Sequence, residues 1–550
     1  MTDLATPPFP SVEVVPLTGA TASDWDAVAV PIAPPITQGG DDGVQPRSGV
    51  ADVATWYGID LADLAELTGA TGKAGEIVTV PLPRLLAGTA QWRDLPRRLV
   101  LVGVGDGTSA DLRLAGAQLA RAAASWGRVL ATVPLVDRET RGDRDGGDVA
   151  FVVGALLASH TAYTRKTGEP ARRLSRLGLA TLATTGTTAA AELAEAADRA
   201  VALAAGTAIA RTLAATPADV ATPEWLADRA RELVEAVTAQ AAGSSGTGSS
   251  GAAGETLDLT IEVHDERWLA SHGFGGMLAV GSGSVNPPRL VAVGYDGRRG
   301  TRRTPQGPTV AIVGKGITYD TGGLALKPRE GMATMKTDMT GSAVALATVL
   351  TAARLRLPVR VVGVMALAEN AFSGSSYRPG DVVRVWDGTT VEIRNTDAEG
   401  RMVLADGLAW AAQTWDPDVL LDVATLTGAA GLALGRGMGA VLTPRDALAG
   451  ALELAGRETG EELWRLPLVA DYRAALDSDV ADVAHIATDP HVSAGTVTAG
   501  LFLERFTGGR PWAHLDIAGP ARSAKARGEI PEGATGFGVR LLVRWLASLG

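Results

Sequence analysis

One short acidic stretch, Asn395–Arg401 (NTDAEGR), constrains this chain more than any other part of its sequence. It follows Val391–Arg394, a run with β-branched residues at alternate positions that is typical of a strand. It precedes Met402–Ala412, in which apolar residues recur at helical spacing. The sequence therefore predicts an acidic loop between a strand and a helix, and loops held in this way commonly contain functional residues.

Charged side chains occupy alternate positions of this loop. In an extended backbone successive side chains point to opposite faces, so Asp397, Glu399 and Arg401 would all project to one side. The result would be a dense acidic site beside a single cation. Acidic turns are also common on solvated surfaces, so the loop alone does not establish a function.

Composition limits what such a site can contain. The chain has 550 residues, 46% hydrophobic and 20% charged, which is typical of a globular protein with about two to four domains. It has no cysteine, so any metal must be held by oxygen or nitrogen. The net charge of -11 disfavours a surface built for nucleic acid or for anionic membranes.

Strand-like and helical runs alternate in the first half of the chain, which predicts an α/β domain behind an irregular leader of about fifty residues. Gly103–Gly107 lacks the full spacing of a dinucleotide-binding fingerprint, so we interpret it as a turn between a strand and a helix. The runs are Arg98–Gly105, Ala110–Trp126, Val129–Pro134 and Val149–Leu157.

A long alanine-rich helix, Ala189–Leu213, is predicted to link this domain to a second one. Thr222 and Pro223 are a suitable cap and first residue for the next helix, Glu224–Gln240. The low-complexity glycine and serine residues of 243–255 predict a flexible surface loop. We therefore divide the chain into residues 1–205 and 206–550.

The second half contains five strand-like runs with helices such as Gly341–Leu355 between them. The predicted fold is α/β with two domains, a smaller amino-terminal α/β domain and a larger carboxyl-terminal one whose mixed central sheet is flanked by helices. The strand-like runs are Leu257–Val263, Leu290–Val293, Thr309–Val313, Val359–Met365 and Val419–Val423.

No segment resembles a targeting or membrane sequence. The first twenty residues lack a basic start followed by an apolar core, and the weakly charged stretch 419–442 contains Asp422 and Arg436. We therefore expect a cytoplasmic protein without a membrane partner.

Further segments extend the acidic pattern. Val313–Lys327 contains Lys315 and Asp320, and Met332–Gly341 contains Asp338. With Asn395–Arg401 they resemble the signature blocks of the leucyl aminopeptidase family, the cytosolic metallopeptidases of that name. Asp422–Ala429 and Trp512–Gly519 extend the resemblance, which covers about residues 206–550 and makes this the catalytic domain.

The resemblance implies a site for two divalent metal ions, zinc or manganese. Four carboxylates packed together repel one another, and two cations would offset that repulsion. By resemblance, Asp320 and Glu399 touch both ions, Lys315 and Asp338 complete the tighter site, and Asp397 serves the more exchangeable one. Each of the six histidines is interpreted as a core or surface residue, since none has a His-Glu-x-x-His neighbour.

The implied activity is removal of amino-terminal residues, preferably leucine or other apolar ones, from peptides with a free amino terminus. A metal-bridging hydroxide would attack the peptide carbonyl. By resemblance, Lys327 stabilises the oxyanion, and Arg401 holds a bicarbonate ion that shuttles the proton. From spacing alone, both cations could equally face solvent.

The resemblance also implies a substrate pocket, and a homohexamer as the assembly. Met335 and Leu426 would give the pocket an apolar floor, although a core role is equally consistent with their sequence positions. The sequence departs from the commoner family wording at Thr340, Ser342 and Met402, beside the ligands. The implied substrate-binding residues are Met335, Asn395, Ala398, Thr425 and Leu426.

Other classes of function are compatible with parts of the pattern. A two-metal hydrolase of phosphate esters would need more cations and a phosphate-binding backbone loop. A DNA-binding or scaffold protein that retains the aminopeptidase fold is disfavoured by the acidic balance. A catalytically inactive homologue is disfavoured because all seven polar residues of the implied site are present.

Overall fold

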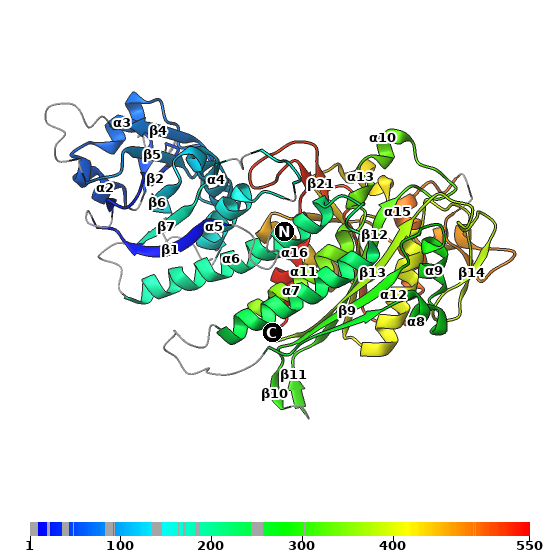
Figure 1. Ribbon diagram of the computed structural model, residues 1–550. Helices are drawn as coiled ribbons and strands as arrows, with labels where there is room; N and C mark the ends of the chain where they lie inside the picture. The colour runs from blue at the N-terminus through cyan, green and yellow to red at the C-terminus, as the bar shows by residue number, and fades with distance from the viewer. Residues whose placement is uncertain are drawn as a thin grey trace.

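The structure is a computed structural model with two α/β parts joined by a long helix (Figure 1). It describes residues 9–550 except 19–21, 36–42, 48, 83–91, 93, 134–145, 163, 169–171, 182–186, 244–256, 302–303, 488 and 490. The tip of the expected leader, residues 1–8, and nearly all of the expected glycine and serine loop lie outside the described residues.

The amino-terminal part is built on a seven-stranded sheet in the order β1-β7-β6-β2-β5-β4, with β3 beside β2. The neighbours from β1 to β5 are parallel, and β4 is antiparallel to β5. The strands are β1 (Ser11–Pro16), β2 (Ala27–Ala33), β3 (Gln45–Pro46), β4 (Ile77–Pro81), β5 (Arg98–Gly103), β6 (Arg128–Ala131) and β7 (Arg176–Thr181).

Helices α2 (Val50–Tyr57) and α3 (Leu61–Leu67) pack on one face of this sheet, and α4 (Ser109–Ala122) and α5 (Gly146–Ser159) on the other. Glycines let α4 and α5 approach closely, since a Cβ atom at Gly116 would lie 2.0 Å from the carbonyl oxygen of Phe151. The Gly103–Gly107 segment is a turn between β5 and α4, as predicted.

The predicted linking helix is α6 (Thr187–Ala215), which runs from the amino-terminal part to the larger one (Figure 1). The division after residue 205 falls inside this helix. The next helix, α7 (Pro223–Gly243), begins as predicted, because the Trp225 N–H donates to Thr222 Oγ1 at 3.2 Å.

The larger part is built on an eight-stranded mixed sheet in the order β18-β17-β20-β16-β12-β13-β9-β8. Its four central strands, β13, β12, β16 and β20, are parallel, so their carboxyl ends meet at one edge. The strands are β8 (Leu259–His264), β9 (Arg289–Asp296), β12 (Thr309–Asp320), β13 (Arg360–Asn370), β16 (Val419–Ala424), β17 (Gly439–Leu442), β18 (Leu463–Arg465) and β20 (Trp512–Asp516).

Two apolar clusters cover the two faces of this sheet. Along β12, Val310 and Ile312 pack with α11 (Thr340–Arg354), α7 and α16 (Val539–Ala547), whereas Ala311 and Val313 pack with α12 (Gly400–Trp415). This alternation buries both faces, as expected for a parallel sheet. Figure 1 shows α7 and α11 on one side of the sheet and α8, α9 and α12 on the other.

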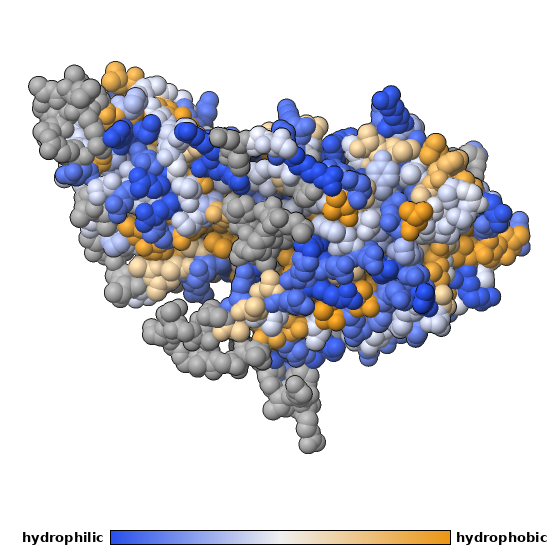
Figure 2. Space-filling view, in the orientation of Figure 1, coloured by the Kyte–Doolittle hydropathy of each residue, from blue (hydrophilic) through white to orange (hydrophobic). Residues whose placement is uncertain are grey.

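The remaining elements lie around this sheet, except η2, which follows α4 in the amino-terminal part. The mixed α/β fold with helices on both faces is as predicted. Figure 2 shows hydrophilic residues over much of this side of the molecule, with hydrophobic residues in separate groups. Among the described residues, no helix is both long and apolar enough to span a bilayer. These elements are α8 (Glu266–Ser271), α9 (Gly275–Gly281), α10 (Arg329–Met332), α13 (Gly428–Leu434), α14 (Asp446–Thr459), α15 (Gly495–Glu504), η2 (Ala123–Ser125), η5 (Met335–Thr337), η6 (Ala470–Leu476), β10 (Arg299–Thr301), β11 (Thr304–Gln306), β14 (Val382–Arg384), β15 (Thr390–Glu392), β19 (Val483–Ala484), β21 (Arg522–Ser523) and β22 (Gly533–Ala534).

Candidate active site

Lys315 lies within β12 and is buried beneath the carboxyl edge of the sheet. Its Nζ atom is 2.8 Å from Asp338 Oδ2 and 2.8 Å from Glu399 Oε1. It also donates a hydrogen bond to the carbonyl oxygen of Thr425 at 3.0 Å. The Lys315 amine therefore connects Asp338 and Glu399, which come from separate segments, with the residue that follows β16.

Lys327 makes a second set of ion pairs at the same edge. Its Nζ atom is 2.8 Å from Asp320 Oδ2 and also contacts Asp397 Oδ1. The Lys327 side chain is 16% exposed, so it does not face solvent freely. All four predicted carboxylates thus contact one of two lysines.

The carboxylates converge closely enough to share a cation. One oxygen from each of Asp320, Asp397 and Glu399 lies within 4.8 Å of the others. Apart from its ion pair with Lys315, the buried Glu399 carboxylate has no hydrogen-bond partner among the described residues. Buried carboxylates without hydrogen bonds are costly, and oxygen ligands of this type suit divalent metals. The residues present therefore fit a metal site.

The electrostatics of the cluster reflect its burial. Burial raises the pKa of Asp338 to about 8, and burial followed by the charge of Glu399 raises the pKa of Asp320. Burial alone would lower the pKa of Lys315, but Asp338 and Glu399 outweigh it and raise that pKa. The pKa of Lys327 is raised in the same way, chiefly by Asp320. The carboxylates of the cluster therefore stabilise positive charge, here the protonated amines of the two lysines.

The acidic loop reaches this arrangement by a different backbone path from the one predicted. Residues 396–397 form a turn and α12 begins at Gly400, so the expectation of an extended segment is wrong. Asn395 Oδ1 accepts the Asp397 N–H at 2.9 Å and its carbonyl oxygen accepts the Ala398 N–H, which curls the chain. Asp397 and Glu399 converge because of this turn, not because of strand alternation.

Three residues that were not among the predicted site residues hold the two acidic segments together. Thr396 Oγ1 donates to the Gly322 carbonyl at 2.7 Å and accepts the Ala325 N–H at 2.8 Å. Asn370, at the end of β13, donates to Asp320 Oδ1 at 2.8 Å, and the Tyr377 hydroxyl donates to the Thr396 carbonyl at 3.0 Å. Asn370 could have been found from its position at the end of a predicted central strand.

His485 anchors the beginning of the acidic loop. Its Nδ1 accepts the Arg394 N–H at 3.2 Å, and Nε2 lies 2.8 Å from the Asn395 carbonyl oxygen. Burial, followed by the charge of Arg401, lowers the pKa of His485 to about 3, so the ring is neutral and Nε2 donates. Nearly ninety residues separate this histidine from the loop, and the sequence offered no signal of the contact.

Arg401 lies in the first turn of α12 and is buried. Its Nη1 donates to the His485 carbonyl at 2.7 Å, and its Nε has no hydrogen-bond partner among the described residues. Burial lowers the pKa of Arg401 to about 10, while the charges of Glu399 and Asp516 act in the opposite direction. Arg401 therefore does not face solvent, the alternative that its spacing allowed.

The five expected substrate-binding residues are half-buried near this edge. Thr425 serves the acidic cluster directly, because its Oγ1 donates to Asp338 Oδ1 at 2.7 Å. The Leu426 N–H donates to Asp516 Oδ1 at 3.1 Å, which fixes the loop after β16. Met335 and Leu426 are both half-buried, and Leu426 packs against the apolar cluster on the α12 face of the sheet.

A buried pair of one histidine and one aspartate links the neighbouring strands β16 and β20. His514 Nδ1 lies 2.5 Å from Asp422 Oδ1, and Trp512 Nε1 donates to Asp422 Oδ2 at 2.8 Å. Burial would lower the pKa of His514, but Asp422 outweighs it and raises that pKa. His485 and His514 are therefore core residues, as predicted, and within the described chain no histidine joins the acidic cluster.

Comparison with known proteins shows the family of the chain. The model of the cytosol aminopeptidase family, catalytic domain, matches residues 208–543. The chain belongs to the cytosol aminopeptidase family. The resemblance to leucyl aminopeptidases is thereby confirmed, and the protein is a hydrolase of the aminopeptidase class.

Similar proteins cover nearly the whole chain. A probable cytosol aminopeptidase of Geobacter sp. (strain M21) is 40% identical over 88% of this chain and 91% of its own. A probable cytosol aminopeptidase of Streptomyces avermitilis is 38% identical over 96% of this chain and 97% of its own. The solved bottromycin maturation enzyme BotP has a TM-score of 0.76 and 34% identity over 96% of this chain and 99% of its own, and a second structure contains Mn. These likenesses do not favour a DNA-binding or scaffold function.

Proposed function

We propose that the protein is a dinuclear metal-dependent aminopeptidase that releases leucine or other apolar residues from peptides with a free amino terminus. The observation that carries the proposal is the convergence of Lys315 with four carboxylates at one sheet edge. Apart from its ion pair with Lys315, the buried Glu399 carboxylate has no hydrogen bond from the residues that the structure describes. Family membership supports peptide hydrolysis, and the Mn complex of BotP supports metal binding.

The same residues would hold two divalent ions, zinc or manganese. Asp320 and Glu399 would contact both ions, with Lys315 and Asp338 on the tighter one and Asp397 on the more exchangeable one. When bound, the ions supply Lewis-acid polarisation of the scissile carbonyl and acidification of a water that attacks it. Their positive charge also replaces the compensation that the two lysines now give the carboxylates.

Lys315 must be neutral to act as a ligand. Removing its proton at pH 7 costs about 4 to 5 kcal/mol from an ordinary lysine pKa, and more here because Asp338 and Glu399 raise that pKa. Structural zinc sites bind with roughly 10 to 16 kcal/mol, so metal binding can offset the cost. Metal affinity should therefore rise steeply with pH.

Lys327 is proposed as the cation that stabilises the developing oxyanion. It lies at the more open side of the cluster, with Asp397, whose side chain is 32% exposed. Once Asp320 and Asp397 are otherwise compensated, the Lys327 amine can donate to a substrate oxygen. This role requires a charged amine at the end of a side chain of this length, so arginine or glutamine would replace Lys327 poorly.

Arg401 is proposed to hold a bicarbonate ion, which would supply a proton carrier between nucleophile and leaving amine. Its unpartnered buried Nε supports anion binding, because guanidinium groups pair readily with planar oxyanions. Met335 and Leu426 supply apolar surface for a leucine-like side chain, beside Asn395, Ala398 and Thr425. A cytoplasmic location, the two-domain division at residue 205 and a homohexamer complete the proposal.

The test is release of leucine from a leucyl amide after chelation and after replacement with zinc or manganese. We expect chelation to abolish activity, either metal to restore it, and Asp397→Ala to lower it at least a hundredfold. Asp63→Ala, at an exposed position of α3 in the amino-terminal part, is the matched control. An N-acetylated substrate should not react. Chelation-resistant activity would exclude the dinuclear proposal.

A further inference from the structure

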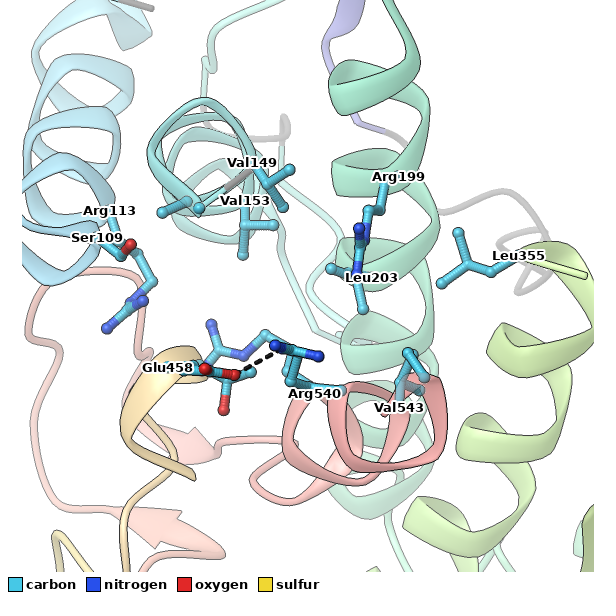
Figure 3. A pocket seen from close by; sticks show the side chains of 15 residues that line it. Ser109, Arg113, Val149, Val153, Arg199, Leu203, Leu355, Glu458, Arg540 and Val543 are labelled. Atoms are coloured by element: carbon cyan, nitrogen blue, oxygen red, sulfur yellow. Dashed lines mark ion pairs between the residues drawn. The ribbon is translucent and has the colours of Figure 1, made fainter. Parts of the chain in front are cut away.

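A cavity of about 290 Å³ lies between the amino-terminal part and the catalytic part, away from the acidic cluster. Figure 3 shows side chains converging on it from α4, α5, α6, α14 and α16. Nothing in the proposed peptide hydrolysis uses it. Its lining residues are Ser109, Arg113, Gly146, Val149, Ala150, Val153, Arg199, Leu203, Leu355, Glu458, Thr459, Arg540, Val543, Arg544 and Ala547.

Arginine is the dominant charged residue of the lining. Arg113, Arg199, Arg540 and Arg544 contribute guanidinium groups, whereas Glu458 is the one carboxylate among the lining residues. The four arginines come from three helices of different parts of the chain, α4, α6 and α16. Such convergence on a cavity differs from the scattered arginines of a solvated surface.

The buried end of the cavity has an excess of positive charge. Arg113 Nε is 3.0 Å from Glu529 Oε1, and Arg540 is 3.1 Å from Glu461 and 3.4 Å from Glu529. Arg211 is buried behind the lining and donates to the backbone carbonyl oxygens of Thr535 and Glu529. Three buried arginines therefore lie near two buried carboxylates in this region. Burial, followed by the charge of Arg540, lowers the pKa of Arg113, while Glu529 and Glu461 act in the opposite direction.

Arg199 adds a second uncompensated charge. It lines the cavity from α6 and has no hydrogen bond or ion pair within the described part of the chain. At the mouth, Arg544 pairs with Glu458 at 2.6 Å, and these side chains are 39% and 36% exposed. The cavity therefore opens to solvent, and the described residues around it carry about two positive charges in excess.

The remaining lining is apolar. Val149 and Val153 of α5, Leu203 of α6 and Val543 of α16 surround the space between the arginines (Figure 3). A volume of about 290 Å³ exceeds that of a single inorganic ion and is close to the lower limit for small-molecule sites. The shape of the lining suits a ligand with one doubly charged group and a small apolar body.

We propose that this cavity binds a small organic phosphate monoester between the two parts of the protein. Two charges on the phosphate match the local excess, and guanidinium groups bind phosphate oxygens through paired hydrogen bonds. The apolar body would lie against the valines and leucine. Because its ligand contacts both parts, binding would stabilise their docking against each other.

The experiment is calorimetric titration of the full-length chain with phenyl phosphate in a phosphate-free chloride buffer. We expect saturable binding, weaker binding of inorganic phosphate and none of phenol. Arg199→Gln should weaken phenyl phosphate binding about tenfold or more. Glu458→Gln should tighten it, since the glutamate competes with the ligand for Arg544.

Arg267→Gln is the matched control, because Arg267 is exposed on α8 and does not line the cavity. Its affinity should equal that of the wild type, and all variants should keep their unliganded unfolding midpoints within a few degrees. Opposite shifts for Arg199→Gln and Glu458→Gln support the site. No binding, equal binding of phenol, or affinities unchanged in both variants would overturn the proposal, whatever the peptidase activity.

Discussion

Gly400 packs directly on the side chain of Lys315: a Cβ atom at residue 400 would lie 2.8 Å from Lys315 Nζ and 2.6 Å from its Cε. Helix α12 can begin against the buried lysine only because this residue has no side chain. The contact places Glu399, the preceding residue, 2.8 Å from the same amine. It explains why a glycine separates the acidic loop from its helix.

Gly400→Ala should therefore displace Lys315 from Glu399 and Asp338. Overpacking of a buried site costs about 1 to 3 kcal/mol, and we expect a loss of that size in urea unfolding together with weaker metal binding. Gly450→Ala, on an open position of α14, should be neutral or slightly stabilising. Equal behaviour of the two variants would show that the contact is unimportant.

Thr396→Val tests the connection between the two acidic segments. The substitution keeps the shape of the side chain but leaves the Gly322 carbonyl and the Ala325 N–H without their partner. An unsatisfied buried group costs about 1 to 3 kcal/mol. We expect reduced stability and faster hydrogen exchange in residues 321–327, whereas Thr55→Val, at an exposed position of α2, should change neither.

Thr425→Val should weaken metal binding without removing a ligand. The Thr425 hydroxyl orients Asp338 through a 2.7 Å hydrogen bond, and the loss of partners of this kind typically reduces metal affinity about 10- to 100-fold. Competition with a chelator would measure the change. A Thr425→Ser variant retains the hydroxyl and should restore most of the affinity. If the Thr425→Val variant binds metal as tightly as the wild type, the hydroxyl does not position Asp338.

His485 gives a prediction about pH. Its pKa is about 3 in the native state, against about 6.5 when unfolded. The unfolded chain therefore binds more protons between these values, and His485 contributes stability above pH 6.5 that is lost as the pH falls towards 3. Each pKa unit corresponds to about 1.4 kcal/mol.

His485→Gln should lower stability at pH 7.5, because the neutral ring anchors the acidic loop. The difference from wild type should narrow as the pH falls from 6.5 to 5, which urea midpoints at several pH values would reveal. His491→Gln, at an exposed position, should leave the pH slope unchanged. A difference that widens at lower pH would contradict the neutral state of His485.

Much of the fold could be predicted because it depends on local pattern. The apolar runs of β12, β13 and β16 are bounded clearly in the sequence, and their parallel arrangement brings Asp320 near the acidic loop. The cap at Thr222 and the helix α6 were equally local features. Lys315 and the carboxylates were found because their motif is dense and specific.

The features that were predicted wrongly or missed depend on turn chemistry and on contacts between distant segments. The extended form expected for the acidic loop ignored the Asx turn at Asn395 and the early start of α12 at Gly400. His485 and Asn370 contact the loop from distant segments, which only the tertiary fold brings together. The arginine-lined cavity likewise needs α4, α6 and α16 to meet, and no single motif encodes it.

Counting bound metal tests the central proposal most directly. After loading with zinc and removal of free metal, elemental analysis should give about two ions per wild-type chain and about one for Asp397→Ala, whose ligand serves the more exchangeable position. The Asp63→Ala control should match the wild type. One ion or none in the wild-type chain, or two in Asp397→Ala, would contradict a dinuclear site built from these residues.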